Sequence, residues 1–285
     1  MKNLIIAFVL FSVLTINAQS KVDSLLLTKT EWVNKNLDYL RFFKDSVVYN
    51  LNETKHQLMF DIKSKKLSFK VKYRVGGSDM RTEDFNFKIK QLYKNKLVII
   101  PIDKEEEIRL KNYNKLNPSP FLKQKQFVFY NRELLISRVK FKKITFHAST
   151  CFGTCPSMSL EIDNNGAIFY QGRTFTKKLK GNFAGKLSAK DFYTLRKILN
   201  RSQLQILDQK WQQKSKPNDT PRYNYIVELI DGKLIEINTN DQHPILDKLS
   251  EYLLNVPEMA NLIKAKKKHK FEESHIDNYK VSYVK

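Results

Sequence analysis

The chain has 285 residues, and 41% of them are hydrophobic, which is enough to bury a core and excludes a fully disordered chain. Lysine and arginine number 51 against 29 aspartates and glutamates, a net charge of +22. Eight glycines, eight prolines and two cysteines exclude collagen-like, proline-rich and disulfide-rich classes. The length predicts one or two domains.

Residues 1–18 are predicted to be a signal peptide. Met1 to Asn3 carries a positive charge, Leu4 to Ile16 is apolar and uncharged, and Ala18 supplies the small residue that a signal peptidase requires. The apolar run is shorter than the roughly 20 residues of a membrane-spanning helix. We therefore expect an exported protein, periplasmic or secreted, with no transmembrane segment in the mature chain.

The charge of the chain predicts an acidic partner. Removal of the signal peptide takes away only one charged side chain, Lys2, so the mature protein stays strongly basic. Such a charge attracts polyanions, and an exported protein meets acidic envelope glycolipid, polysaccharide and other exported proteins. Nucleic acid is not expected outside the cytoplasm, and no pattern in the sequence indicates a cofactor.

Residues 19–140 are predicted to form a β domain. Residues 42–49 are one candidate strand, and residues 67–75 alternate strictly between apolar and polar, which is typical of a half-buried strand. Residues 85–90 alternate again and precede the apolar run 97–100, which indicates a hairpin. Together these patterns predict an antiparallel sheet or small barrel.

Residues 25–135 resemble the lipocalin-like β domains of exported bacterial proteins. In that family a tryptophan near the start plugs the base of the barrel, and Trp32 stands in the corresponding place, ahead of the first predicted strand. The chain departs from the family at Thr30, where the pattern has glycine. The alternative is that Trp32 is simply a large core aromatic.

Residues 141–263 are predicted to form an α+β domain, an antiparallel sheet with two helices on one face. Its elements alternate or follow helical spacing and are separated by turn signals. In chain order they are a strand at 144–147, an alternating strand at 158–162, a hairpin turn at Asp163–Gly166, a helix capped by Ser188, a hairpin about Asp231-Gly232 and a helix starting at His243-Pro244.

One motif in this region has a distinctive form, Cys151-Phe152-Gly153-Thr154-Cys155-Pro156. With the elements that follow it, the stretch from Lys142 to about Ile263 resembles a family of exported bacterial domains of unknown function that carry a Cys-Phe-Gly-Xaa-Cys-Pro motif. The resemblance implies a domain boundary, but it brings no activity, substrate or cofactor.

Three interpretations of the cysteine pair remain open. A structural disulfide between Cys151 and Cys155 suits an oxidising compartment, and Gly153 permits the tight turn that it requires. A reactive thiol is the second, although redox pairs usually have two intervening residues rather than three. The third is a metal site that uses His147, Cys151 and Cys155. Taken alone, His147 is expected to be a surface or hydrogen-bonded histidine.

Residues 264–285 are predicted to be a basic, flexible tail with a solvated surface. No catalytic template is present in the chain, so no catalytic residue is assigned. The sequence as a whole predicts an exported, non-catalytic binding or structural module of the bacterial cell envelope. The alternatives are a thiol-disulfide or metal-dependent enzyme that uses Cys151 and Cys155, and a polyanion-binding surface protein.

Overall fold

The computed structural model describes five stretches of the chain: residues 24–51, 54–76, 78–102, 124–210 and 220–273. The chain forms two compact units, Met1–Leu135 and Ile136–Lys285. The predicted signal peptide and residues 274–285 of the predicted tail lie outside the described residues. Within the described stretches, no helix is long and apolar enough to cross a membrane.

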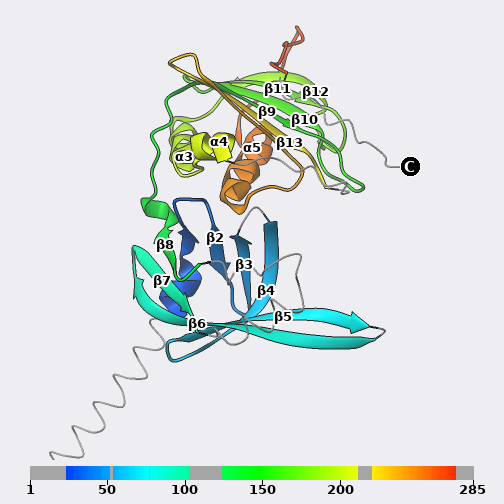
Figure 1. Cartoon of the computed structure of the whole chain (residues 1–285). Coiled ribbons are helices and arrows are strands. Elements are labelled where there is room, and N and C mark those ends of the chain that lie inside the picture. The colour runs from blue at the N-terminus through cyan, green and yellow to red at the C-terminus, as the bar shows by residue number, and fades with distance from the viewer. Residues whose placement is uncertain (1–23, 52–53, 77, 103–123, 211–219, 274–285) are drawn as a thin grey trace, which may run out of the picture. The chain divides into compact units, whose positions relative to one another are not determined.

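The first unit is a closed antiparallel barrel (Figure 1), as one of the two predicted alternatives had it. Its strands are β1 (Glu31–Val33), β2 (Tyr39–Phe42), β3 (Ser46–Leu51), β4 (Thr54–Lys63), β5 (Lys66–Gly76), β6 (Asp79–Tyr93), β7 (Lys96–Pro101) and β8 (Phe127–Asn131). The barrel closes because β1 pairs with β2 on one side and with β8 on the other.

Side chains fill the interior of this barrel. In the hairpin of β5 and β6, Leu67 lies opposite Phe87 and Phe69 opposite Phe85, and all four are buried. The rings of Phe69 and Phe87 lie 5.3 Å apart, and those of Phe87 and Phe127 lie 6.1 Å apart. The alternation in the sequence thus produces an aromatic core, because every second side chain of a barrel strand points inward.

A buried tryptophan and a buried arginine lie where the two ends of the barrel chain meet. Trp32 is fully buried, and its indole N–H donates to the carbonyl of Leu27 at 3.3 Å. Arg132 is only 2% exposed and lies in the short 3-10 helix η2 (Arg132–Leu134), directly after β8. Its guanidinium donates to the carboxylate of Glu31, the neighbour of Trp32, at 2.6 Å. This ion pair joins the last strand to the first.

Two local expectations for the first unit are wrong. Trp32 does not precede the first strand but lies within β1, where its backbone pairs with Leu40 and Asn131. The candidate strand over 42–49 is interrupted by a turn, closed by a hydrogen bond of 2.7 Å from the backbone N–H of Phe43 to the carbonyl of Ser46. The three-residue strand β1 is too short to show a pattern, and the turn contains no glycine or proline to mark it.

The second unit has a seven-stranded antiparallel sheet in the order β14-β13-β9-β10-β11-β12-β15. Its strands are β9 (Phe141–Ala148), β10 (Met158–Asp163), β11 (Ala167–Gly172), β12 (Gly181–Lys186), β13 (Tyr223–Leu229), β14 (Leu234–Thr239) and β15 (Ile263–Lys264). With its helices, it confirms the predicted α+β class.

Helices cover one face of this sheet (Figure 1). They are α3 (Ala189–Leu199), α4 (Leu204–Lys210) and α5 (Asp247–Met259), which the 3-10 helix η3 (Pro244–Leu246) precedes. The hydroxyl of Tyr252 in α5 donates to the carbonyl of Asp191 in α3 at 2.7 Å. The sequence predicted α3 and α5 and missed α4, whose seven residues bury Leu204 and Leu207 but are too few to display a helical period.

Predicted caps and turns of the second unit are present. Ser188 caps α3, and its hydroxyl accepts from the backbone N–H of Asp191 at 3.1 Å. Gly166 has a φ of 80° and donates its N–H to the carbonyl of Asp163, closing the hairpin of β10 and β11. These local signals fix the turn between β10 and β11 and the start of α3.

Loss of the buried arginine should unfold the barrel more readily. In Arg132→Met the carboxylate of Glu31 loses its closest buried partner, so we expect the free energy of unfolding to fall by about 3–5 kcal/mol. Arg41→Met is the matched control, since Arg41 contacts the same carboxylate at 3.6 Å but is 42% exposed, and it should cost at most about 1 kcal/mol. Urea titration followed by Trp32 fluorescence in a Trp211→Phe background measures both, and equal losses would contradict the prediction.

Candidate functional site

The cysteine motif forms a small covalently closed loop between β9 and β10. The sulfur atoms of Cys151 and Cys155 are 2.00 Å apart, and their Cα atoms are 5.5 Å apart, so the structure joins the pair in a disulfide. A Cβ atom on Gly153 would meet only the sulfur of Cys151, at 3.7 Å. The side of the loop that carries Gly153 is therefore not covered by other parts of the described structure.

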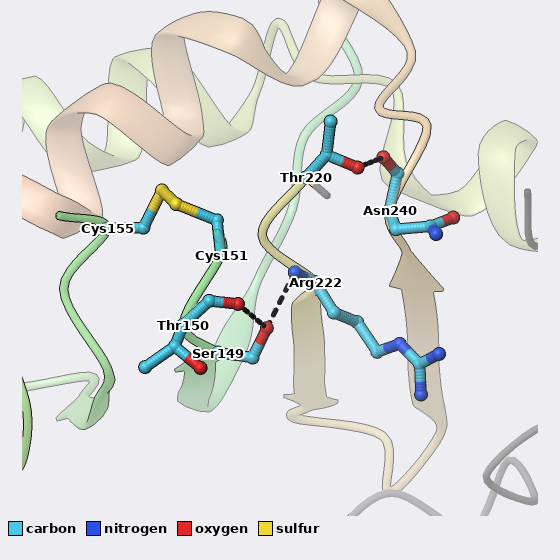
Figure 2. The surroundings of a disulfide bond; sticks show 7 residues. All are labelled: Ser149, Thr150, Cys151, Cys155, Thr220, Arg222 and Asn240. Carbon is cyan, nitrogen blue, oxygen red and sulfur yellow. Dashed lines mark hydrogen bonds between the residues drawn. A yellow bond between two sulfur atoms is a disulfide. The ribbon is translucent and has the colours of Figure 1, made fainter. Parts of the chain in front are cut away.

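Hydrogen bonds fix both ends of this loop to neighbouring segments, and Figure 2 shows those at its start. At the start, the N–H of Ser149 donates to the carbonyl of Arg222 at 3.0 Å, and the N–H of Arg222 donates to the Ser149 hydroxyl at 2.8 Å. At the other end, Ser157 exchanges backbone hydrogen bonds of 2.9 Å with Thr174 and Arg173. The disulfide and these anchors restrict the loop to a narrow range of positions.

The loop presents an aromatic ring to solvent. Phe152 is 90% exposed, an unusual state for a large apolar side chain held by a rigid backbone. Phe175 is also exposed, and it follows the segment that pairs with Ser157 at the same end of the sheet. The loop anchors are formed by the backbones of Arg173 and Arg222, and the guanidinium of Arg173 donates to Ser159 and Gln171 on the sheet. This end of the sheet therefore presents two exposed aromatic rings.

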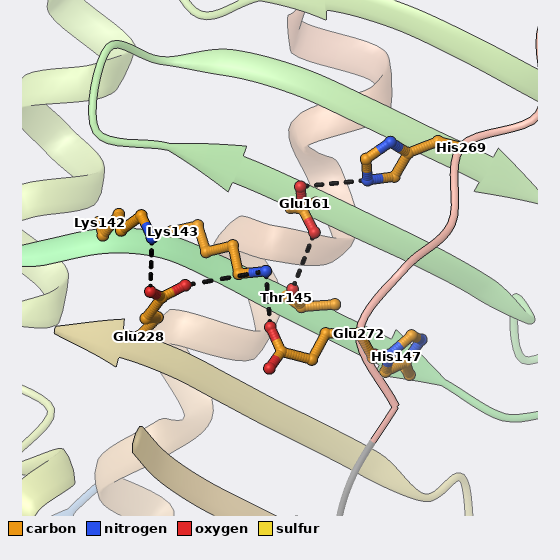
Figure 3. Close-up of polar contacts among 8 residues, drawn as sticks. All are labelled: Lys142, Lys143, Thr145, His147, Glu161, Glu228, His269 and Glu272. Carbon is orange, nitrogen blue, oxygen red and sulfur yellow. Dashed lines mark hydrogen bonds and ion pairs between the residues drawn. The ribbon is translucent and has the colours of Figure 1, made fainter. Parts of the chain in front are cut away.

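His147 has a separate environment, on the sheet face that the helices leave uncovered (Figure 3). One ring nitrogen, Nε2, lies 2.8 Å from the carbonyl oxygen of Glu272, and the other, Nδ1, lies 2.8 Å from the hydroxyl of Ser159. Because a carbonyl only accepts, the neutral ring carries its proton on Nε2, and Nδ1 accepts from Ser159. The same hydroxyl accepts from the guanidinium of Arg173 at 2.7 Å.

This environment lowers the pKa of His147. Burial disfavours the charged imidazolium and is the main cause, and the positive charge of Arg173 adds to it. The carbonyl of Glu272 and the carboxylates of Glu273 and Glu161 oppose the shift without cancelling it. His147 is thus held as a neutral hydrogen-bonding group, in line with the expectation of a hydrogen-bonded histidine.

Charged side chains lie along the same face as His147 (Figure 3). Lys143 contacts the carboxylate of Glu272 at 2.6 Å, and this hydrogen bond is the main cause that raises the pKa of Lys143. Lys142 contacts Glu228 at 2.7 Å and thereby lowers the pKa of that carboxyl group. The face therefore carries fixed charges of both signs.

The structure does not bring the three residues of the metal interpretation together as ligands. Cys151 and Cys155 share the disulfide, and both ring nitrogens of His147 have other partners. In the part of the chain that the structure describes, no group of three or more histidine, cysteine, aspartate or glutamate side chains could hold a metal ion.

Sequence reasoning missed the partners of His147. The alternation of residues 158–162 places Ser159 and Glu161 on the polar face of β10, so the pattern alone could have indicated the face on which they lie. Their pairing with His147 and Thr145 depends on the register of β10 against β9, which a single strand does not specify. Arg173 follows β11 and joins the group only through the folded sheet.

Residues 142–259 match a protein family described as a domain of unknown function, DUF6438. The match runs from the second residue of β9 to the last residue of α5 and includes the disulfide loop. No curated protein and no solved structure matches the chain. The predicted presence of a domain of unknown function is confirmed, while the family motif and the lipocalin-like resemblance stay predictions.

Acidification should weaken the second unit through His147. Its pKa in the folded state lies below the ordinary 6.5, so the stability that the neutral ring contributes is fully present above about pH 6.5 and is lost as the pH falls further. We expect β9 and β10 to unfold at a lower urea concentration at pH 5.5 than at pH 7.5. Hydrogen exchange of their backbone amides, corrected for the intrinsic exchange rate at each pH, measures this difference.

The variant His147→Gln should reduce this dependence on pH, because an amide does not titrate between these values. An unchanged pH dependence in His147→Gln would show that another group is responsible.

Proposed function

We propose that this protein is an exported, non-catalytic binding module of the bacterial cell envelope, and that it contacts its partner through the disulfide loop. The observation that carries the proposal is the 90% exposure of Phe152 on a loop that is closed covalently and anchored at both ends. Aromatic side chains are frequent energetic anchors of interfaces, and a rigid loop loses little conformational entropy on binding.

The charge of the chain favours an acidic partner. The start of the loop is anchored to the backbone of Arg222, and the whole chain carries +22. Among the partners that the sequence predicts, another exported protein suits Phe152 best, since a single projecting ring fits a pocket bordered by acidic residues. Glycolipid and polysaccharide offer negative charge but no such pocket.

For the first unit we infer a lipocalin-like barrel. Support comes from the fully buried Trp32 in β1 and from the ion pair between Glu31 and Arg132 that joins the two ends of the barrel chain. The aromatic side chains that fill the interior favour a structural role for this unit over binding of a large ligand inside it.

The thiol chemistry of the alternative enzyme is tested by alkylation of the natively purified protein without reductant. We expect both cysteines to remain unmodified and the intact mass to be that of the oxidised chain, because the bridge leaves no thiolate. Reduction before alkylation is the control and should add two labels. Two labels without reductant, or protection that a chelator removes, would favour the thiol or metal enzyme.

The binding function is tested by placing a photo-crosslinking phenylalanine analogue at position 152 in cells that export the protein. We expect a protein adduct of one defined mass. The same analogue at Tyr193, an aromatic residue of α3 that is 70% exposed, is the matched control and should give none. Charge reversal by Arg222→Glu should reduce the adduct at least about tenfold, because like charges repel an acidic partner.

Two outcomes of this experiment would contradict the proposal. Equal adducts at positions 152 and 193 would mean that Phe152 is not an anchor. An adduct to glycolipid or polysaccharide would identify a partner of a different class.

A further inference from the structure

The chain continues after α5 across the uncovered face of the sheet. We call residues 263–273 the strap. The strap begins with β15, which pairs with β12 through Ile263 and Lys264. The N–H of Ala265 donates to the carbonyl of Asn182 at 2.9 Å. The strap then crosses over β11, β10 and β9 on the face opposite the helices (Figure 3). The sequence predicted a solvated tail from residue 264 onward, whereas the described part of it lies on the protein.

Two rings of the strap hold it on the sheet. His269 stacks on Phe169 of β11, with the ring centroids 4.0 Å apart and the planes inclined by 4°. A nitrogen of His269 lies 3.1 Å from the carboxylate of Glu161 in β10. Phe271 meets His269 edge-on at 4.8 Å and His147 at 6.3 Å. These rings are the apolar anchors that a purely charged tail would lack.

The residue after Phe271 is bound through its side chain and its backbone. The carboxylate of Glu272 contacts Lys143 at 2.6 Å, and the carbonyl of Glu272 accepts from His147 at 2.8 Å. The lysines of the strap, in contrast, are exposed: Lys264, Lys266, Lys267, Lys268 and Lys270. The sheet therefore contacts the pair Phe271-Glu272, while the lysines that dominate the composition of the strap face solvent.

The groups that receive the strap are oriented by the sheet itself. Ser159 and Arg173 hold the ring of His147, and Glu161 accepts from the hydroxyl of Thr145 at 3.2 Å. Lys143 also lies 3.8 Å from Glu228. Because these contacts do not involve the strap, the receiving surface is organised before a peptide binds, which lowers the cost of binding.

A polar side chain continues this surface toward β13. Asn224 pairs in register with His147 and is 7% exposed, and neither its amide oxygen nor its amide nitrogen has a hydrogen-bond partner among the described residues. A buried unpaired amide is costly. Since an amide both donates and accepts, it suits the backbone of an extended peptide.

We propose that the polar face of β9, β10 and β11 is a recognition surface for an extended peptide segment of a partner protein, in which an aromatic residue is followed directly by an acidic one. Phe271-Glu272 of the strap occupies this surface in cis. The proposal concerns a different surface from the disulfide loop, so it does not depend on the role of Phe152. A covalently attached occupant has an effective concentration on the order of millimolar, so a partner has to displace it.

The test uses the full chain and a fluorescent peptide with the sequence of residues 263–273. In Phe271→Ala/Glu272→Ala the strap loses its two recognised side chains, and we expect this variant to bind the peptide at least about tenfold more tightly than the wild-type chain, because competition in cis is weaker. Fluorescence anisotropy at physiological salt measures both. A control peptide with alanine in place of the phenylalanine and the first glutamate keeps every lysine and should bind at least about tenfold more weakly.

A variant of the receiving surface completes the test. Adding Lys143→Glu to the strap variant should abolish peptide binding, whereas adding Phe152→Ala should leave it unchanged, and this separates the two surfaces. Equal binding of the two peptides, or binding that Lys143→Glu does not change, overturns the proposal. It is also overturned if hydrogen exchange shows that the strap of Phe271→Ala/Glu272→Ala is released and this variant still does not bind the peptide. Dimers of the wild-type chain that disappear in the strap variant would make a second copy the occupant and overturn the assignment to a partner.

Discussion

The interior strand β9 positions His147 and the start of the disulfide loop in the second unit. It pairs with β10 on one side and with β13 on the other, so its register determines which side chains lie under the helices and which lie on the opposite face. Ile144 and Phe146 are buried, while Thr145 and His147 join the polar contacts of the uncovered face. A shift of one residue would exchange the two faces, because side chains alternate along a strand.

Two surfaces follow from this arrangement, and they differ in chemistry. The loop between β9 and β10 is closed by a disulfide and presents Phe152 on a restrained backbone, which suits an aromatic anchor in a partner's pocket. The polar face holds His147 neutral between Ser159 and Glu272 and offers charges of both signs to an extended chain. A rigid projecting ring and a preorganised polar face both reduce the entropy lost on binding.

Much of the fold could be predicted because its signals are local. The alternation in β5 and β6, the cap at Ser188 and the hairpin glycine Gly166 act within a few residues, and these three features are present. The short strand β1 and the helix α4 carry too few residues to show a period, so their existence depends on tertiary packing. Closure of the barrel likewise depends on the pairing of β1 with β8, far apart in the sequence.

The sequence by itself determined the α+β class, the candidate loop of Cys151 and Cys155, and the expectation that His147 is a surface or hydrogen-bonded histidine. It left open whether the cysteines are a bridge, thiols or metal ligands, because their state depends on the three-dimensional positions of two sulfur atoms. Only the tertiary structure brought Ser159, Arg173 and Glu272 to His147 and laid the strap on the sheet. Those contacts join residues separated by up to 125 positions, and local patterns carry no information about such distant pairs.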